Sequence, residues 1–512
     1  MKQLALDGRG LSLGDFRELF RGGDVQLSIA APAMAAVARA RALVEKHVAA
    51  GDVVYGLTTG FGKLKSVAIA RADLVALQTN LVLSHCCGVG APMPIAEVRA
   101  AQVLRLNGLV RGHSGVRPEV CDFLVRLFNK RFVPLVPQQG SVGASGDLAP
   151  LAHMAAATMG HGEAYVDGVP MSAAAALAKL GEKPLVLEAK EGLALINGTE
   201  IMKAIAVGIL LRAANLSRAA DAIASLSIEA LQGSLVPFDA RFAELKGHAG
   251  HRRTSDNLRR CLADSAVIAG HADCDRVQDP YSLRCIPQVH GSFKTALEHV
   301  ESVLAHELNA VTDNPILFPD TDEVLSAGQF HGQPISVVMD YLAIALCTLA
   351  NISERRIEQM VNPDLSRLPA FLVKQPGLHS GMMIAQVAAA SLASENKSLA
   401  HPASVDSIPT SANQEDHVSM GVTAARKARA ITDNVEYVLA IEALCAAQAR
   451  EFHKELRAGR GAQSVYDCLR KRIAPNDADR FLHKDIEAAR ELVATGELCQ
   501  AVTSALGREL DS

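Results

Sequence analysis

The chain has 512 residues, of which 49% are hydrophobic and 21% charged, so it can bury a large core. Its net charge is −4 and it has no basic tract, which argues against a nucleic-acid partner. The ten cysteines are scattered, with one vicinal pair at 86–87 and no Cys-x-x-Cys, and there is no His-Glu-x-x-His. This pattern predicts reduced thiols and no metal site. The chain also lacks a phosphate-binding glycine motif, so we expect no nucleotide cofactor.

The N-terminal residues 1–8 contain no basic stretch followed by an apolar run. A secretory signal needs both features, so we expect no signal peptide and a cytoplasmic protein.

Residues 140–153 contain the sequence Gly143-Ala-Ser-Gly-Asp147, for which three interpretations stay open. The first is an ordinary capped turn before a helix. The second is a serine nucleophile, although the segment does not fit the Gly-x-Ser-x-Gly elbow and no strand of β-branched residues precedes it. The third is an electrophile that the backbone makes from Ala144-Ser145-Gly146.

The third interpretation has a specific chemistry. If the amide nitrogen of Gly146 attacks the carbonyl carbon of Ala144 and two waters leave, one of them with the Ser145 hydroxyl, the product is a methylidene-imidazolone ring. Its exocyclic methylene accepts nucleophiles, a property that ordinary side chains lack. Gly146 has no Cβ, which permits the close approach that cyclisation needs.

A helix is predicted to begin directly after this turn. Asp147 stands in the capping position, Pro150 is tolerated in the first turn, and Leu148, Leu151 and Met154 follow at helical spacing. The positive end of this helix would stabilise negative charge on the ring oxygen.

The composition shifts around residues 182–199, where Lys183-Pro184 and Asn197-Gly198 interrupt the helical pattern. We therefore predict two domains. Residues 1–199 form an N-terminal domain that carries the Ala-Ser-Gly sequence, and residues 200–512 form a helical-bundle domain with C-terminal helices.

Helical periodicity dominates the second half of the chain and predicts a mostly α-helical fold. The apolar positions of one such helix recur at steps of three and four residues: Phe293, Ala296, Leu297, Val300, Val303, Leu304 and Leu308. Residues 335–352 are apolar nearly all round, but Asp340, Thr348 and Asn351 interrupt them. We expect a buried central helix of a bundle there, not a membrane span.

Seven motifs occur in the same order as in a known enzyme family: Tyr55-Gly-Leu-Thr-Thr-Gly-Phe-Gly62, Leu83-Ser-His-Cys-Cys-Gly-Val-Gly90, Gly143-Ala-Ser-Gly-Asp147, Ala194-Leu-Ile-Asn-Gly-Thr199, Gln278-Asp-Pro-Tyr-Ser-Leu-Arg-Cys285, Leu308-Asn-Ala-Val-Thr-Asp-Asn-Pro315 and Ser407-Ile-Pro-Thr-Ser-Ala-Asn-Gln-Glu-Asp-His417. The whole chain resembles the histidine ammonia-lyase family, of the class that also includes phenylalanine and tyrosine ammonia-lyases.

The resemblance implies a long-helix bundle assembled as a homotetramer, with active sites that combine residues of several subunits. It implies deamination of L-histidine to trans-urocanate and ammonia, the first step of histidine degradation. The electrophile would be the methylidene-imidazolone (MIO) formed autocatalytically from Ala144, Ser145 and Gly146, with Asp147 assisting the cyclisation. No metal or nucleotide is implied, nor any membrane partner.

The resemblance also assigns proton transfer to phenols. Tyr55 is the candidate base, and its pKa must then be brought towards the working pH by neighbouring positive charge or hydrogen-bond donors. Glycines at 56, 60 and 62 would let its loop move as a lid. Tyr281 is a second phenol beside the electrophile, and the sequence leaves open how the two share the proton.

Other residues are assigned to binding. Arg284 would hold the substrate carboxylate through two parallel charge-assisted hydrogen bonds. Asn197 and Gln278 would donate neutral hydrogen bonds to the carboxylate and the ring oxygen. Phe330 would pack on the electrophile.

Two residues point to the substrate. In this family His85 and Glu415 accompany an imidazole substrate, because a carboxylate can accept an imidazole N–H and a histidine can hold the other nitrogen. A phenyl ring would leave both groups unpaired. Without the resemblance, His85 would be read as a satisfied core histidine and Glu415 as part of a solvated helix face.

Two alternatives and some departures remain. One alternative is a tyrosine or phenylalanine ammonia-lyase, or an aminomutase, that uses the same electrophile; the other is an inactive scaffold or a serine hydrolase. The family's usual Gly-Gly-Asn-Phe is Ala327-Gly-Gln-Phe330 here, and its Asn-Ser-Gly-Phe is His379-Ser-Gly-Met382. The departures at Gln329, His379 and Met382 bear on the geometry of the pocket.

Overall fold

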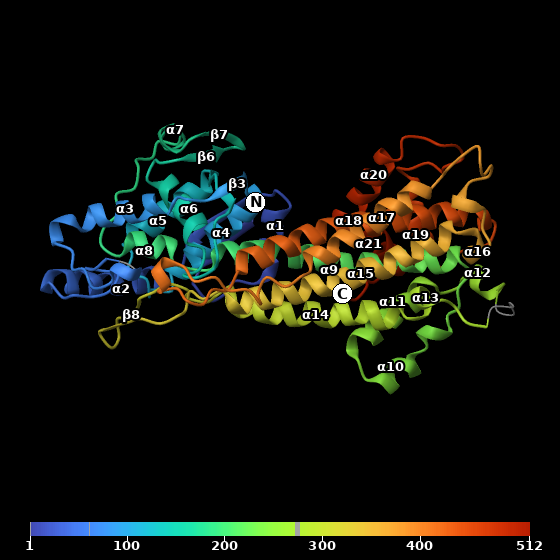
Figure 1. The fold of residues 1–512 in the computed structure, drawn as a ribbon, viewed down its shortest axis with the longest axis horizontal. Coiled ribbons are helices and arrows are strands. Elements are labelled where there is room, and N and C mark those ends of the chain that lie inside the picture. The colour runs from blue at the N-terminus through green and yellow to red at the C-terminus, as the bar shows by residue number, and fades with distance from the viewer. Residues whose placement is uncertain (1, 61, 272–276) are drawn as a thin grey trace. The chain divides into compact units, whose positions relative to one another are not determined.

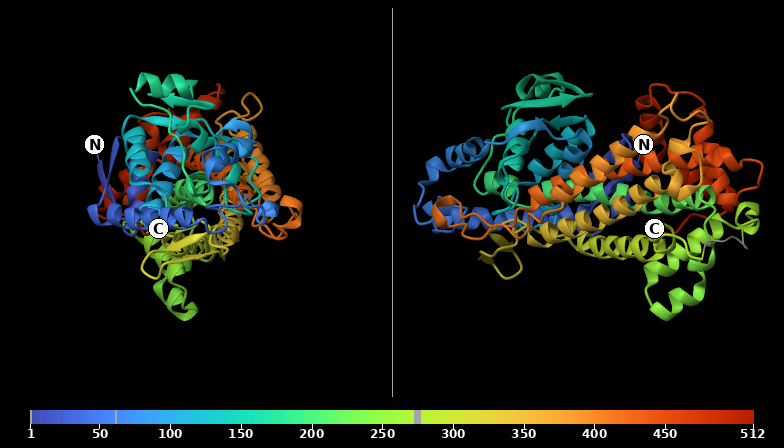
Figure 2. Two further views of the ribbon diagram at one scale, coloured as in Figure 1. Left: turned by 90° about the vertical axis from the view of Figure 1, so that its left-hand side faces the viewer. Right: turned by 45° about the vertical axis from the view of Figure 1, so that its right-hand side comes forward.

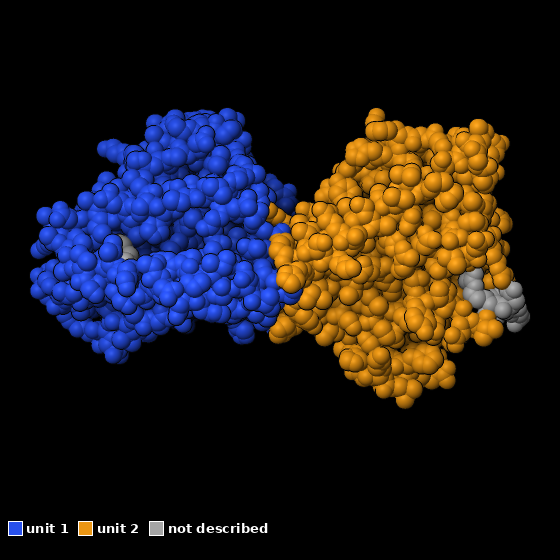
Figure 3. All heavy atoms as spheres, viewed as in Figure 1, with its two compact units in different colours: residues 1–208, 301–340, 402–426 blue, residues 209–300, 341–401, 427–512 orange. Residues whose placement is uncertain are grey.

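The computed structural model describes residues 2–60, 62–271 and 277–512. The described chain is mostly α-helical, as predicted (Figure 1). It divides into two compact units, each built from three stretches of sequence (Figure 3). The first unit comprises residues 1–208, 301–340 and 402–426, and the second comprises residues 209–300, 341–401 and 427–512. The domain boundary between residues 199 and 200 stays a prediction.

The first unit combines short strands with helices. Its helices are α1 (Arg17–Phe20), α2 (Ala31–Ala50), α3 (Leu74–His85), α4 (Ile95–Leu109), α5 (Pro118–Asn129), α6 (Leu148–Thr158), α7 (Ala173–Lys179) and α8 (Glu191–Ile196). Its strands are β1 (Lys2–Leu6), β2 (Val25–Ile29), β3 (Val89–Pro92), β4 (Phe132–Pro134), β5 (Pro137–Gln139), β6 (Glu163–Val166), β7 (Val169–Ser172), β8 (Ile316–Phe318) and β9 (Glu323–Leu325).

Four small sheets hold these strands. β1 and β2 pair in parallel, with Lys2 opposite Val25 and Leu6 opposite Ile29. β3 pairs with β5, β8 pairs with β9, and β4, β6 and β7 form a three-stranded sheet, all antiparallel. β6, β7 and α7 lie together at one edge of the first unit (Figure 2).

The core of the first unit at the three-stranded sheet is made by small and apolar side chains of α5, α6 and α7 and of the strands β4 and β6. It contains Phe123, Leu127, Phe132, Ala157, Ala164, Val166, Ala173, Ala176 and Leu177.

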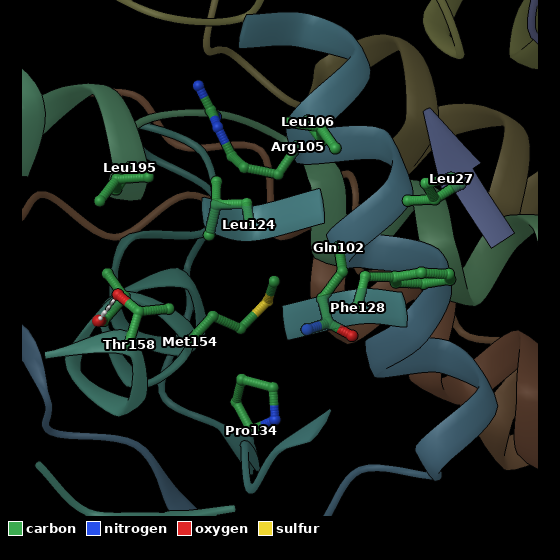
Figure 4. Close-up of a pocket in the computed structure, with 11 residues that line it drawn as sticks. Leu27, Gln102, Arg105, Leu106, Leu124, Phe128, Pro134, Met154, Thr158 and Leu195 are labelled. Carbon is green, nitrogen blue, oxygen red and sulfur yellow. Dashed lines mark hydrogen bonds between the residues drawn. The ribbon is translucent and has the colours of Figure 1, made fainter. Parts of the chain in front are cut away.

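A small cavity of about 40 Å³ lies beside this core (Figure 4). The Met154 side chain of α6 points into it, and Leu124, Phe128 and Pro134 line it. Ligand sites usually measure roughly 300–1,000 Å³, so this cavity is a packing gap and not a substrate site.

Four long helices each have residues in both units: α9 (Glu200–Ala230), α14 (Ile286–Glu307), α15 (Gln333–Val361) and α18 (Gly421–Arg450). The remaining helices belong to the second unit: α10 (Ala240–Lys246), α11 (Ala249–Cys261), α12 (Ala266–Ala269), α13 (Tyr281–Arg284), α16 (Pro363–Ser366), α17 (Met383–Leu399), α19 (Arg460–Arg470), α20 (His483–Ala494) and α21 (Glu497–Leu506).

A buried polar network ties these helices together within the second unit. Arg356 on α15 donates to both oxygens of Glu442 on α18, at 2.6 and 2.8 Å. Ser227 on α9 donates to the same carboxylate at 2.7 Å. Buried charges require such partners, so this network specifies how the helices pack.

The predicted helix around Phe293–Leu308 is α14, although Leu308 lies one residue beyond its end. The predicted positions are buried except for Val303, which is partly exposed. The predicted central helix is α15, which is long and apolar enough to cross a bilayer by length and composition. However, 61% of its most apolar stretch is buried inside the structure, as in the core helix of a bundle. One side of α15 is not covered within the chain, because Val337, Tyr341 and Ile344 are 43–48% exposed.

Candidate active site

A cavity of about 730 Å³ in the first unit gathers most of the residues singled out in the sequence. It is lined by Tyr55, His85, Ala144, Ser145, Asn197, Phe330 and Glu415, among others. These residues come from six separate stretches of the chain. The volume lies within the range that small-molecule sites occupy, roughly 300–1,000 Å³.

The Ala144-Ser145-Gly146 turn lies between β5 and α6, and its backbone is pressed against a second turn. Gly146 has φ +73° and forms a parallel bridge with Gly198, which follows α8. A Cβ on Gly146 would lie 2.0 Å from the carbonyl oxygen of Gly198. Only glycine fits here, because both the positive φ and the close approach exclude a side chain.

Asn197 is the side chain that contacts this turn most directly. Its Nδ2 donates to the Ser145 carbonyl oxygen at 2.9 Å, and only 3% of its surface is exposed. Its Oδ1 is buried without a hydrogen-bond partner among the described residues. Arg105 fixes this segment by donating to the Asn197 carbonyl at 2.7 Å and to Glu200 Oε2 at 2.9 Å.

Asp147 stands at the N-cap position of α6, as predicted, but its side chain does not cap that helix. The carboxylate instead accepts the backbone N–H groups of Ile201 at 2.9 Å and Met202 at 3.0 Å, in the first turn of α9. Those N–H groups are buried and lack intrahelical partners, which is why a neighbouring carboxylate satisfies them. Burial raises the pKa of Asp147 to about 7.

Glu415 is bonded through both carboxylate oxygens. Ser145 Oγ donates to Oε1 at 2.8 Å, and Thr410 Oγ1 donates to Oε2 at 2.7 Å. Glu415 does not lie on a solvated helix face. It belongs to a loop that lines the cavity.

The Ser145 contact also bears on the serine-hydrolase alternative. A serine hydrolase needs a base such as histidine on its nucleophile, whereas the Ser145 hydroxyl donates to a carboxylate.

His85 is the last residue of α3. Its Nδ1 lies 2.7 Å from the Leu81 carbonyl oxygen and 3.1 Å from Ser84 Oγ. A carbonyl can only accept, so Nδ1 carries the proton in this contact. The neutral ring then offers Nε2 as an acceptor.

Tyr55 lies in the glycine-rich loop before α3. Burial raises its pKa, and the nearby carboxylates of Glu415 and Asp313 raise it further, while a backbone hydrogen bond from Gly62 lowers it. The net direction is opposite to the one expected for a base. Apart from burial, the groups that shift this pKa are therefore one backbone donor, which lowers it, and two carboxylates, which raise it.

Phe330 lines the cavity just before α15, although the exposed Gln329 precedes it where the family has asparagine. The other departures, His379 and Met382, belong to the second unit, where Met382 is buried.

Gly146 belongs to the turn but is not among the residues that line this cavity. Three further predicted residues, Gln278, Tyr281 and Arg284, belong to the second unit and do not line it. Gln278 and Arg284 line a separate cavity of about 900 Å³ in the second unit. Tyr281 is 69% exposed, and the Arg284 guanidinium lies over its ring at 4.4 Å. The first unit thus holds the Ala-Ser-Gly turn and the two residues predicted to bind the imidazole, His85 and Glu415. Arg284, which is predicted to hold the carboxylate, belongs to the second unit.

The cavity also contains residues that the sequence did not single out. His331 and His417 line it, and their rings stack with centroids 5.7 Å apart. Lys65 lines it as well and donates to Gln414 at 3.0 Å. His417 and Gln414 lie within one of the seven motifs, and His331 directly follows Phe330. Closeness in sequence to residues already singled out could therefore have identified them as cavity residues.

A family model described as aromatic amino acid lyase matches residues 11–471, and the chain belongs to this family. Its fold and its carbon–nitrogen lyase class are those that the motifs predicted. The chain is 54% identical over 471 residues to the histidine ammonia-lyase of Symbiobacterium thermophilum, covering 92% of this chain and 93% of the relative. It is 49% identical to that of Myxococcus xanthus over 504 residues, covering 98% and 99%.

Solved structures show the same fold. The histidine ammonia-lyase of Trypanosoma cruzi aligns with a TM-score of 0.91 at 40% identity, over 98% of this chain and 95% of the other. A tyrosine aminomutase of Streptomyces globisporus aligns with a TM-score of 0.93 at 35% identity, over 99% and 100%. The fold alone does not separate these activities.

Proposed function

We propose that the protein converts L-histidine to trans-urocanate and ammonia, the first step of histidine degradation. The observation that carries this proposal is a single cavity lined by Ser145, Glu415 and His85, in which the Ser145 hydroxyl donates to Glu415. The relatives named histidine ammonia-lyase, at about half identity over nearly the whole chain, support it.

We further propose that Ala144-Ser145-Gly146 becomes the MIO group. The tight, side-chain-free backbone at Gly146 fits the ring closure. Such a group supplies an electrophilic methylene that takes up the substrate amine and makes it a better leaving group.

Asn197 is placed to assist at the ring oxygen. The Ser145 carbonyl oxygen becomes that oxygen on cyclisation, and Asn197 Nδ2 already donates to it at 2.9 Å. A fixed donor aimed at developing negative charge stabilises the transition state more than the ground state. The buried Asn197 Oδ1 has no partner among the described residues and can accept a substrate N–H.

Glu415 and His85 are proposed to hold the imidazole. Ring closure removes the Ser145 hydroxyl as water, so Glu415 Oε1 loses its donor and is free to accept an imidazole N–H. His85 Nε2 is an acceptor in the described geometry, and a ring flip or protonation would make it a donor. A phenyl ring would leave both groups unpaired.

Tyr55 is proposed as the residue that takes the proton, with Tyr281 as the second phenol. The Gly62 backbone hydrogen bond to Tyr55 stabilises its phenolate, but burial opposes that form. A positive charge close to the phenol would offset the burial. The ammonium group of an incoming amino acid and the proposed Arg284 both carry such a charge.

We propose that a homotetramer completes the site and that Gln278, Tyr281 and Arg284 reach it from another subunit. Two features support this assembly. Tyr281 is largely exposed. Apolar side chains are also exposed on α15, at Val337, Tyr341 and Ile344, and on α17, at Ile384 and Val387. Such faces mark interaction surfaces.

We expect the assembled enzyme to act in the cytoplasm.

The second candidate is a tyrosine or phenylalanine lyase or aminomutase. The structural similarity to the tyrosine aminomutase supports this second candidate. Its ring pocket would need partners other than a histidine and a carboxylate, so His85 and Glu415 argue against it.

Incubation with histidine, phenylalanine and tyrosine in parallel tests the proposal. We expect urocanate and ammonia in equal amounts from histidine, at a higher kcat/KM than for the other two amino acids. A preference for tyrosine, or a product that retains its amine, would contradict the assignment.

A further inference from the structure

The loop that carries Glu415 has an unusual backbone. Ser411, Ala412 and Asn413 have φ values of +54°, +51° and +68°, so three successive residues with side chains are left-handed. Left-handed backbone is unfavourable for such residues and persists only where surrounding contacts impose it.

The contacts that impose this conformation join the two ends of the loop. Thr410 N–H donates to the Glu415 carbonyl at 2.9 Å, and Glu415 N–H donates to the Thr410 carbonyl at 3.3 Å. The pair forms an antiparallel bridge that closes the turn. Within the turn, Asn413 N–H donates to the Thr410 carbonyl at 3.0 Å.

The Thr410 side chain continues this closure to the cavity. Its hydroxyl donates to Glu415 Oε2 at 2.7 Å, while Oε1 faces Ser145. A β-branched residue has few χ1 rotamers, so Thr410 holds its hydroxyl in a defined direction. Of the two side-chain donors that the described residues offer this carboxylate, only Thr410 remains once the Ser145 hydroxyl has left.

We propose that Thr410 is a positioning residue, which aims the free oxygen of Glu415 at the imidazole of the substrate and so supports the preference for histidine. This inference rests on the proposed function. Without the Thr410 hydroxyl, the carboxylate can rotate away from the ring and must be reordered on each binding event.

The test replaces Thr410 by valine, which keeps the shape and removes the hydroxyl, and by serine, which keeps the hydroxyl. We expect Thr410→Val to lower kcat/KM for histidine about tenfold, because a hydrogen bond to a charged group is lost. Thr410→Ser should stay within about twofold of the wild type. Thr410→Ala removes the hydroxyl by truncation and should show the same loss, which provides a second variant if valine impairs assembly.

The matched control is Thr321→Val. Thr321 Oγ1 donates to Glu323 Oε2 at 2.6 Å in an exposed pair outside the cavity, so the same change is made to the same kind of contact. We expect it to leave kcat/KM for histidine unchanged. The mass of the Ala144–Gly146 peptide, measured in every variant, shows whether the electrophile has formed.

A double-mutant cycle separates positioning from general damage. In a Glu415→Ala background Thr410 has no carboxylate to hold, so Thr410→Val should cost less than about twofold there. An unchanged kcat/KM in Thr410→Val, or an equal loss in both backgrounds, would overturn the inference while the wild type still makes urocanate. A wild type that makes no urocanate would contradict the proposed function and this inference with it.

Discussion

At the scale of single residues, Asp147 shows how a side chain can serve an element other than the one it precedes. Its position directly after the Ala-Ser-Gly sequence predicted a cap for the following helix. The carboxylate instead caps α9, which begins 53 residues later in the sequence. Sequence spacing identifies the residue type that a cap needs, but not which of two converging helices receives it.

The buried Asp147 carboxyl should make stability depend on pH. Its pKa is about 7 in the folded protein against 3.8 for the unperturbed group, so the folded state binds the proton more tightly. Its contribution is full below pH 3.8 and is lost as the pH rises through about 7. In Asp147→Asn the amide oxygen can still cap α9, so this pH-dependent component should disappear.

Thermal unfolding of the wild type and Asp147→Asn across this pH range measures the effect. The melting temperature of the wild type, relative to the variant, should fall as the pH rises towards 7. A difference that stays constant or rises with pH would show that the carboxyl is ionised throughout.

Asn197 gives a prediction about catalysis. Asn197→Leu removes the donor on the Ser145 carbonyl oxygen but keeps a side chain of similar size. We expect kcat for histidine to fall about 100-fold or more, as for other lost oxyanion donors. The steady-state rate is compared after peptide mass has shown complete ring closure, and an unchanged kcat would remove Asn197 from this role.

At the scale of elements, the decisive contact is the one between the turn before α6 and the turn between α8 and α9. The start of α6, including Pro150 in its first turn, followed from local sequence signals. The pairing of Gly146 with Gly198 did not, because it joins residues far apart in the chain and depends on the packing of three helices. The motifs contain both glycines, but they do not show that the two backbones approach each other too closely for a side chain.

The close packing around Gly198 predicts that a side chain at this position destabilises the fold. A Cβ at Gly198, where φ is +156°, would lie 2.3 Å from both Arg105 Nη1 and Glu200 Oε2. Gly198→Ala should therefore lower the free energy of unfolding by about 2 kcal/mol or more. Gly181→Ala is the control, because Gly181 also has a positive φ but nothing lies within 4 Å of its Cβ position.

Urea unfolding of both variants gives the comparison. The control should cost only about 1 kcal/mol, the backbone penalty alone. Equal losses in the two variants would mean that the close approach at Gly198 adds nothing.

At the scale of the whole molecule, the exposed apolar side of α15 is a feature that the sequence pattern did not predict. An apolar pattern nearly all round predicts burial on every side, but it does not distinguish burial within one chain from burial between chains. The same limit applies to Tyr281 and Arg284. Their motif identified them, while the residues around the first cavity do not include them.

Subunit mixing tests the shared site. Tyr55→Phe and Arg284→Ala should each be nearly inactive alone. In mixed oligomers, one site can combine Tyr55 from one chain with Arg284 from another, so activity should reappear. Native mass spectrometry checks that mixed oligomers form, and mixed oligomers without activity would indicate that each chain supplies both residues to its own site.

The proposed function depends on the conversion of Ala144-Ser145-Gly146 into the electrophile that acts on histidine. Peptide mass spectrometry of the segment around residues 144–146 from active protein tests it most directly. The wild-type peptide should be lighter than its sequence by two water molecules, and the Ser145→Ala peptide, from an inactive protein, should not show this loss. A full-mass wild-type peptide in protein that still releases urocanate from histidine would contradict the claim.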